Sequence, residues 1–139
     1  MSFSFFDHTG DVGVHLDAPS LEALFSSAAD ALLETLSDPS TVRPTESVIV
    51  SLRAAELDLL LVDWLSELLY RFDAHGVLTS RTSVTLSQED GWHLSADAQG
   101  ERFDPERHAI KVLVKGITYH SLRVQRSGDG WTATVIFDI

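Results

Sequence analysis

The sequence predicts an α+β fold, in which two amphipathic helices pack on a largely antiparallel or mixed sheet. Its length of 139 residues is that of one ordinary domain, and no linker, repeat or low-complexity segment divides it. Two stretches repeat apolar residues at helical spacing, and most of the remainder alternates apolar with polar residues, as half-buried strands do. We therefore expect a single domain over residues 1–139.

Two strands and a helix open the chain. The strands are predicted over 3–6 and 12–16, and Ser20 is the expected N-cap of the helix. The helix ends before Asp38-Pro39, because a proline disfavours helical backbone at the preceding residue. The residues of its apolar stripe are Leu21, Leu24, Phe25, Ala28, Leu32 and Leu36.

A second helix is predicted from Leu57, after a strand over 48–52, and Gly76 ends it. Its apolar stripe includes Trp64 and Phe72, which we interpret as core residues. The remaining residues form strands over 78–87, 92–99, 110–117, 122–125 and 132–137. Asp-Gly turns at 90–91 and 129–130 are typical of hairpins.

Charge and composition limit the classes of function. Acidic residues outnumber basic ones by 21 to 10, and the formal charge of −11 disfavours direct binding to a nucleic-acid backbone. The chain has no cysteine, which excludes disulfides, thiolate zinc sites and thiol catalysis. No signal-peptide pattern and no apolar run near the ~20 residues of a membrane span occurs. We expect a cytoplasmic protein that makes no membrane contact.

The first candidate cluster lies between the two opening strands. Asp7, His8, Thr9 and Asp11 fall on one turn, where two carboxylates, an imidazole and a hydroxyl can converge. Functional groups concentrate on such loops, because rigid neighbours hold them in place. In the alternative interpretation, Asp7 and Thr9 only bond the local backbone in an Asx-type turn.

The second candidate cluster is the end of the chain, Asp138-Ile139, directly after an alternating strand. If Ile139 stays packed, its α-carboxylate is held beside the Asp138 side chain, and the two negative groups repel unless a cation lies between them. Carboxylates without cysteine or paired histidines favour a hard cation, calcium or magnesium, over zinc. A solvated C-terminus is the simpler alternative.

The third candidate cluster is the pair Lys111 and Lys115, the only lysines of the chain. Their even spacing would put both on one face of the predicted strand over 110–117, although a solvated strand face is the commoner explanation. No nucleophile elbow, phosphate-binding glycine loop or zinc-protease motif occurs, and the six histidines show no short metal-ligand spacing. The residues alone therefore do not indicate an enzyme.

Six segments, taken together and in order, resemble the archease family. They are Asp7-His8-Thr9-Gly10-Asp11 and the segments 36–44, 63–73, 100–108, 114–120 and 138–139. The similarity extends over essentially the whole chain. Gly10 and Gly116 depart from the family pattern, which usually has alanine at both positions.

The resemblance implies an accessory protein, not an enzyme, that activates the RtcB-type RNA ligase. It would promote the GTP-dependent guanylylation and multiple turnover of the ligase in tRNA splicing and RNA repair, and would meet RNA only through the ligase. By resemblance, the metal ligands are Asp11, Asp138 and the terminal carboxylate of Ile139. The expected cation is calcium, with magnesium or manganese as alternatives.

Further residues are assigned a supporting role in partner activation. By resemblance, Lys115 is the family's lysine and Asp7 its leading acid, and His8 and His120 are grouped with them. Two other functions stay open. The first is a metal-dependent phosphoester hydrolase with Asp11 and Asp138 on the ion and His8 or His120 as general base. The second is a chaperone-like protein-binding module that uses no metal.

Overall fold

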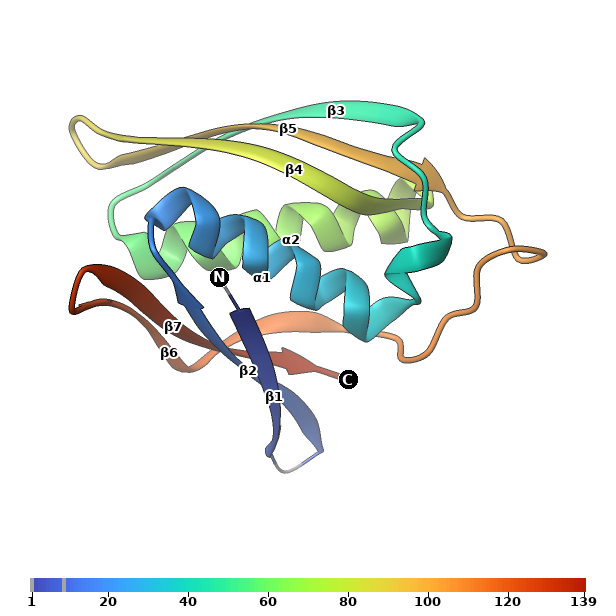
Figure 1. Ribbon diagram of the computed structural model, residues 1–139, viewed down its shortest axis with the longest axis horizontal. Helices are drawn as coiled ribbons and strands as arrows, with labels where there is room; N and C mark the ends of the chain where they lie inside the picture. Colours follow the sequence, from blue (N-terminus) through green and yellow to red (C-terminus); the bar gives the residue numbers. More distant parts are fainter. Residues whose placement is uncertain (1, 9) are drawn as a thin grey trace.

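The structure is a computed structural model that describes residues 2–8 and 10–139. Within these residues, two antiparallel sheets enclose two α-helices in three layers (Figure 1). Sheet A has the strand order β1-β2-β7-β6 and sheet B the order β3-β5-β4. The elements are β1 (Ser2–His8), β2 (Asp11–Ala18), α1 (Leu21–Leu36), the 3-10 helix η1 (Pro39–Thr41), β3 (Glu46–Ala54), α2 (Leu57–His75), β4 (Val77–Gln88), β5 (Trp92–Arg102), β6 (Gly116–Ser127) and β7 (Gly130–Asp138).

Both helices have the limits that their sequences predict. Ser20 caps α1, and its hydroxyl accepts a hydrogen bond of 3.1 Å from the backbone N–H of Ala23. Gly76 ends α2 with a φ of 69°, in the left-handed region that glycine adopts most readily. Neither helix of the described chain is both long and apolar enough to cross a membrane.

The core lies between the helices and the two sheets. Trp64 is fully buried at its centre, and its indole N–H donates to the carbonyl of Phe25 at 2.9 Å, which satisfies the one polar group of the ring. Phe72, at the far end of the same stripe, is partly buried against this core. Each sheet contributes residues with little or no exposed surface; examples are Val14, Leu16, Leu78, Leu94, Val135 and Phe137.

The predicted α+β class with antiparallel strands is confirmed, but the strands form two sheets with the helices between them. The predicted strand over 110–117 is wrong for most of its length: Gly116 and Ile117 begin β6, but residues 103–115 form no helix or strand. Their polar groups bond to the end of α1 instead. The Ser37 hydroxyl donates to the carbonyl of Ala109 at 2.7 Å, and the N–H of Lys111 donates to the carbonyl of Leu36 at 2.8 Å. Lys111 and Lys115 therefore share no strand face.

Candidate functional site

The turn between β1 and β2 positions the first two candidate side chains. His8 lies opposite Asp11 in this hairpin, and Gly10 in the turn has a φ of +78°. Glycine adopts this left-handed backbone more readily than alanine does, so the departure from the resembled pattern suits the turn. Thr9, which belongs to the first predicted cluster, lies outside the described residues.

Asp11 meets the end of the chain across the next pair of strands. It lies directly opposite Asp138 in the β2–β7 pairing, and Gly116 of β6 lies opposite Asp138 on the other side. Opposed residues of antiparallel strands have Cβ atoms about 4.5–5.5 Å apart. Both side chains are on the face of sheet A that points away from the helices, because the alternate residues Val12 and Phe137 pack on the core. Two carboxylates from opposite ends of the sequence thus become neighbours.

The last residue is held in place beside these carboxylates. The side chain of Ile139 is partly buried against the core, which restrains the residue that follows Asp138. The backbone N–H of Lys115 donates to the carbonyl of Asp138 at 2.6 Å, which fixes the entry of β6 next to the end of β7. Lys115 itself is exposed. The structure therefore places Lys115 next in space to Asp138 and Ile139.

Two histidines meet above this end of sheet A. The pairing of β6 with β7 is irregular between Thr118 and Arg123, and Ser121 in this bulge has a φ of 56°. The bulge carries His120, whose ring centroid lies 4.9 Å from that of His8 on the opposite edge strand. The Nδ1 atom of His8 lies 3.5 Å from Oδ2 of Asp11, too far for a good hydrogen bond, and it is buried without a hydrogen-bond partner.

Asp7 does not join the other predicted site residues. It lies opposite Val12, so its side chain is on the helix side of the hairpin, whereas His8 and Asp11 are on the open side. We give the name carboxylate cluster to the group of side chains on the open face together with the end of the chain. Its members are Asp11, Asp138 and the carboxylate of Ile139, with His8, His120 and Lys115 around them.

The carboxylate cluster offers oxygen ligands and has little positive charge to balance them. Within residues 2–8 and 10–139, no lysine or arginine forms an ion pair with Asp11 or Asp138. In the same range, no three His, Asp or Glu side chains are placed to hold a metal ion. A cation at the two aspartates would therefore take its further ligands from groups other than these side chains, and the main-chain carboxylate of Ile139 is the predicted one. Oxygen donors of this kind suit a hard cation.

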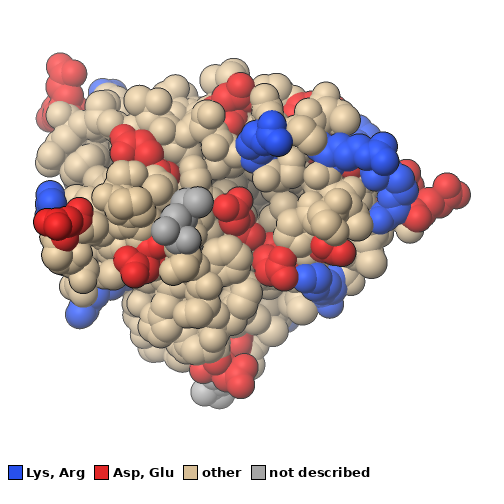
Figure 2. All heavy atoms as spheres, in the orientation of Figure 1, with Lys and Arg blue, Asp and Glu red and all other residues tan. Residues whose placement is uncertain are grey.

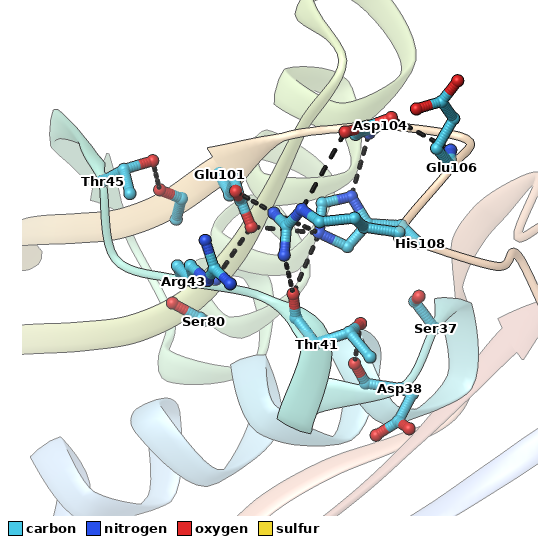
Figure 3. Close-up of polar contacts among 12 residues, drawn as sticks. Ser37, Asp38, Thr41, Arg43, Thr45, Ser80, Glu101, Asp104, Glu106 and His108 are labelled. Atoms are coloured by element: carbon cyan, nitrogen blue, oxygen red, sulfur yellow. Dashed lines mark hydrogen bonds and ion pairs between the residues drawn. The ribbon is translucent and has the colours of Figure 1, made fainter.

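A second histidine–carboxylate cluster joins the end of β5 and the segment after it to η1 (Figure 3). The side chain of His108 is fully buried, and its Nδ1 accepts a hydrogen bond of 2.9 Å from the N–H of Asp104. Its Nε2 therefore carries the proton, and it donates to Oε1 of Glu101 at 3.0 Å and to the carbonyl of Thr41 at 3.1 Å. Arg107 forms an ion pair with Glu101 in the same cluster.

This histidine cluster is closed, because each of its charges already has a partner. The backbone N–H of Arg43, followed by the side chains of Arg107 and His108, holds the pKa of Glu101 at about 2 against the opposing effect of desolvation. The cluster ties the segment after β5 to the segment before β3. No motif or spacing in the sequence indicates this role of Glu101 and His108; the resemblance over 100–108 is the one signal that marks the segment.

Comparison with known proteins agrees with this fold over the whole chain. The model of the Archease protein family matches residues 3–139. Curated archeases from Methanopyrus kandleri and Sulfurisphaera tokodaii are 36% and 34% identical to the chain, and the alignments cover 96% of both chains in the first case and 99% and 98% in the second.

Two solved structures have the same architecture. The solution structure of protein 1598 from Methanobacterium thermoautotrophicum superposes with a TM-score of 0.82 at 32% identity, over 99% of this chain and 98% of that one. An archease from Thermotoga maritima, described as a possible chaperone, shares the fold with a TM-score of 0.65 at 20% identity, over 96% and 94% of the two chains. The chain belongs to the archease family.

Proposed function

We propose that this protein is a metal-binding accessory factor that activates an RtcB-type RNA ligase. It promotes the GTP-dependent guanylylation of the ligase and allows each ligase molecule to turn over repeatedly in tRNA splicing and RNA repair. Family membership supports the accessory role. The single observation that carries the metal part is the direct opposition of Asp11 and Asp138 beside the terminal carboxylate.

The donor set fits a hard divalent cation, calcium first, with magnesium and manganese as alternatives. Two aspartate side chains and a main-chain carboxylate supply oxygen donors only, which calcium prefers. When bound, the cation supplies a fixed positive charge at the open end of sheet A, of the kind that stabilises charge developing on phosphate. The hairpin turn at Gly10 and the packed side chain of Ile139 hold the donors in place.

The residues around the donors have distinct supporting tasks. Lys115 is exposed, and its own backbone anchors it to Asp138, so its ammonium group can contact a partner that docks on this face. The rings of His8 and His120 lie close together over the same end of the sheet, and the ring of His8 lies beside the carboxylate of Asp11. Asp7 lies on the other side of the sheet, so we assign it no part in binding this cation.

The test is multiple-turnover RNA ligation by the cognate ligase, with excess RNA and GTP. Addition of this protein should raise the number of turnovers per ligase from about one to many. The Asp138→Asn variant should lose this effect. Asp17→Asn is the matched control, because Asp17 is an exposed aspartate on the same face of β2, far from Asp138. Failure of the wild-type protein to change turnover would contradict the accessory role.

A second candidate is a chaperone-like protein-binding module that needs no metal. The description of the Thermotoga maritima archease as a possible chaperone favours it. This candidate predicts that Asp138→Asn, as a folded protein, activates or stabilises its partner as well as the wild type does. The metal-dependent proposal predicts loss of the effect in the same variant, so the ligation assay separates the two.

A further inference from the structure

A groove lies on the helix side of the β1–β2 hairpin, where α1 ends. Its volume is about 470 Å³, and its walls come from three parts of the chain. The hairpin contributes Phe5, Asp7 and Val12, α1 contributes Glu34, and the segment after β5 contributes Lys111 and Val112. We name it the β1 groove. It combines apolar surface with carboxylates and lies on the side of sheet A opposite to the carboxylate cluster.

The charge in the β1 groove is predominantly acidic. Within the described part of the chain, the carboxylate of Asp7 makes no hydrogen bond or ion pair with another residue. Lys111 is already engaged, since its Nζ donates to the carbonyl of Glu34 at 2.9 Å and lies 3.3 Å from Oε1 of the same residue. In Figure 2 the lower lobe, which the hairpin forms, shows acidic side chains and no basic one. The groove therefore favours a cationic occupant.

The groove adjoins an edge strand. β1 pairs with β2 alone, so alternate residues of β1 turn their N–H and C=O groups away from the sheet. Two other edge strands have a side-chain cap. Glu22 of α1 accepts from the N–H of Leu86 in β4 at 3.3 Å, and Asp58 of α2 accepts from the N–H of Val124 in β6 at 3.1 Å. No such cap protects β1 among residues 2–8 and 10–139.

The sequence of β1 also lacks the usual protection of an exposed edge. Edge strands are normally guarded by charged residues or proline, and β3 has Glu46 and Arg53. β1 has no charged residue before Asp7, and it alternates serine with phenylalanine from Ser2 to Phe5. Phe5 remains 44% exposed. An uncharged aromatic edge beside an acidic groove is a surface suited to a partner strand.

We propose that β1 accepts an extended segment of a basic partner polypeptide as an added strand of sheet A. The main chain of the segment pairs with the free edge of β1, and an arginine or lysine side chain enters the β1 groove, with its stem against Phe5 and its charge at Asp7. A second copy of this chain fits less well, because β1 has no lysine or arginine to meet Asp7 and each copy has a formal charge of −11.

This inference goes beyond the proposed function and does not depend on it. The β1 groove and the carboxylate cluster are on opposite sides of sheet A, so both can be occupied at once.

The experiment uses the whole protein and three ten-residue peptides followed by NMR. The first peptide alternates valine with arginine. The second has glutamate in place of every arginine, and the third keeps the arginines but has proline in place of alternate valines, so that it cannot form a strand. We expect only the first peptide to bind and to slow hydrogen exchange of β1 amides. Its affinity should fall about tenfold in Asp7→Asn and stay unchanged in Asp17→Asn.

Several results would overturn the inference. Equal binding of the proline peptide would mean that charge alone attracts the arginines, and equal binding of the glutamate peptide would remove the role of Asp7. Absence of binding, or binding without protection of β1, would show that the edge is not used. Protection of β1 at high protein concentration without peptide, together with dimers in sedimentation, would assign the edge to a second copy.

Discussion

Two clusters in this protein pair histidine with carboxylate, and they differ in whether the negative charge is already balanced. In the closed cluster, Glu101 accepts from His108, from Arg107 and from a backbone N–H, and the ring of His108 is fully buried. In the carboxylate cluster, Asp11 and Asp138 face each other, and among residues 2–8 and 10–139 their one basic ion-pair partner is the ring of His8, at 3.5 Å from Asp11. Similar residue types therefore occur in two different settings: the charges of the closed cluster are paired within the fold, whereas the carboxylate cluster is the site that we propose for a cation.

The largest effect that we expect on stability comes from the closed cluster. His108→Ala should lower the free energy of unfolding by about 2–4 kcal/mol, because it leaves a cavity and removes partners from Glu101, Thr41 and Asp104. Denaturant unfolding measures this loss of unfolding free energy, and the control is the exposed His75 changed to alanine. A loss below 0.5 kcal/mol, within the range of ordinary surface changes, would contradict the structural role of His108.

The second effect concerns the terminal carboxylate. A C-terminal extension moves this carboxylate away from Asp138, so we expect calcium affinity to fall about tenfold or more, while an N-terminal extension of the same length leaves it unchanged. A tenfold loss corresponds to about 1.4 kcal/mol. Titration calorimetry on the two extended proteins gives the comparison. Equal affinities would remove Ile139 from the ligand set.

Acid should weaken the closed cluster in a defined direction. The pKa of Glu101 is lowered to about 2 in the folded protein, from an ordinary value of 4.5. Its contribution to stability is therefore fully present above about pH 4.5 and is lost as the pH falls from there toward 2. Burial raises the pKa of Asp30, so protonation of this carboxylate in acid favours the folded state, opposite to the effect of Glu101.

The variant Glu101→Gln isolates this contribution. Its stability should lie below that of the wild type at neutral pH, and the gap should close as the pH falls below 4.5. Thermal unfolding at a series of pH values measures the gap. A gap that stays constant down to pH 3 would show that ionised Glu101 does not hold the cluster together.

The smallest expected effect is a change in stability whose sign differs between the two clusters. In metal-free buffer, Asp11→Asn should leave stability unchanged or raise it by about 0.2–1 kcal/mol, since it removes a like-charge pair directly across two strands. Addition of calcium should stabilise the wild type and not the variant. A clear loss of stability without metal would mean that Asp11 already has a favourable partner in the fold.

Much of the fold follows from local sequence signals. The limits of α1 and α2 follow from Ser20 and Gly76, and both predicted hairpins form, β4–β5 and β6–β7, although the second turn has Gly128-Asp129 at its centre. These features depend on backbone preferences of single residues, so they can be inferred without the rest of the chain. The division of the strands into two sheets depends on long-range pairing, which no local pattern encodes.

The features that the sequence does not predict correctly all depend on contacts between distant parts of the chain. The segment 110–117 alternates like a strand, but its backbone bonds to the end of α1 and to Asp138, so tertiary contacts override the pattern. The closed cluster joins residues from β5, the following segment and η1, and no spacing in the sequence reveals that His108 is buried among them. The meeting of Asp11 with Asp138 likewise needed the order of strands in sheet A.

Calcium titration calorimetry of the wild type and two single variants gives the sharpest test of a cation site between Asp11 and Asp138. Asp138→Asn removes one of the two opposed carboxylates, and Asp17→Asn removes an equal charge elsewhere on the same face of sheet A. The account predicts one calcium site in the wild type, the same affinity in Asp17→Asn, and a loss of about a hundredfold or more in Asp138→Asn. Equal affinities in all three proteins would contradict a cation site between Asp11 and Asp138.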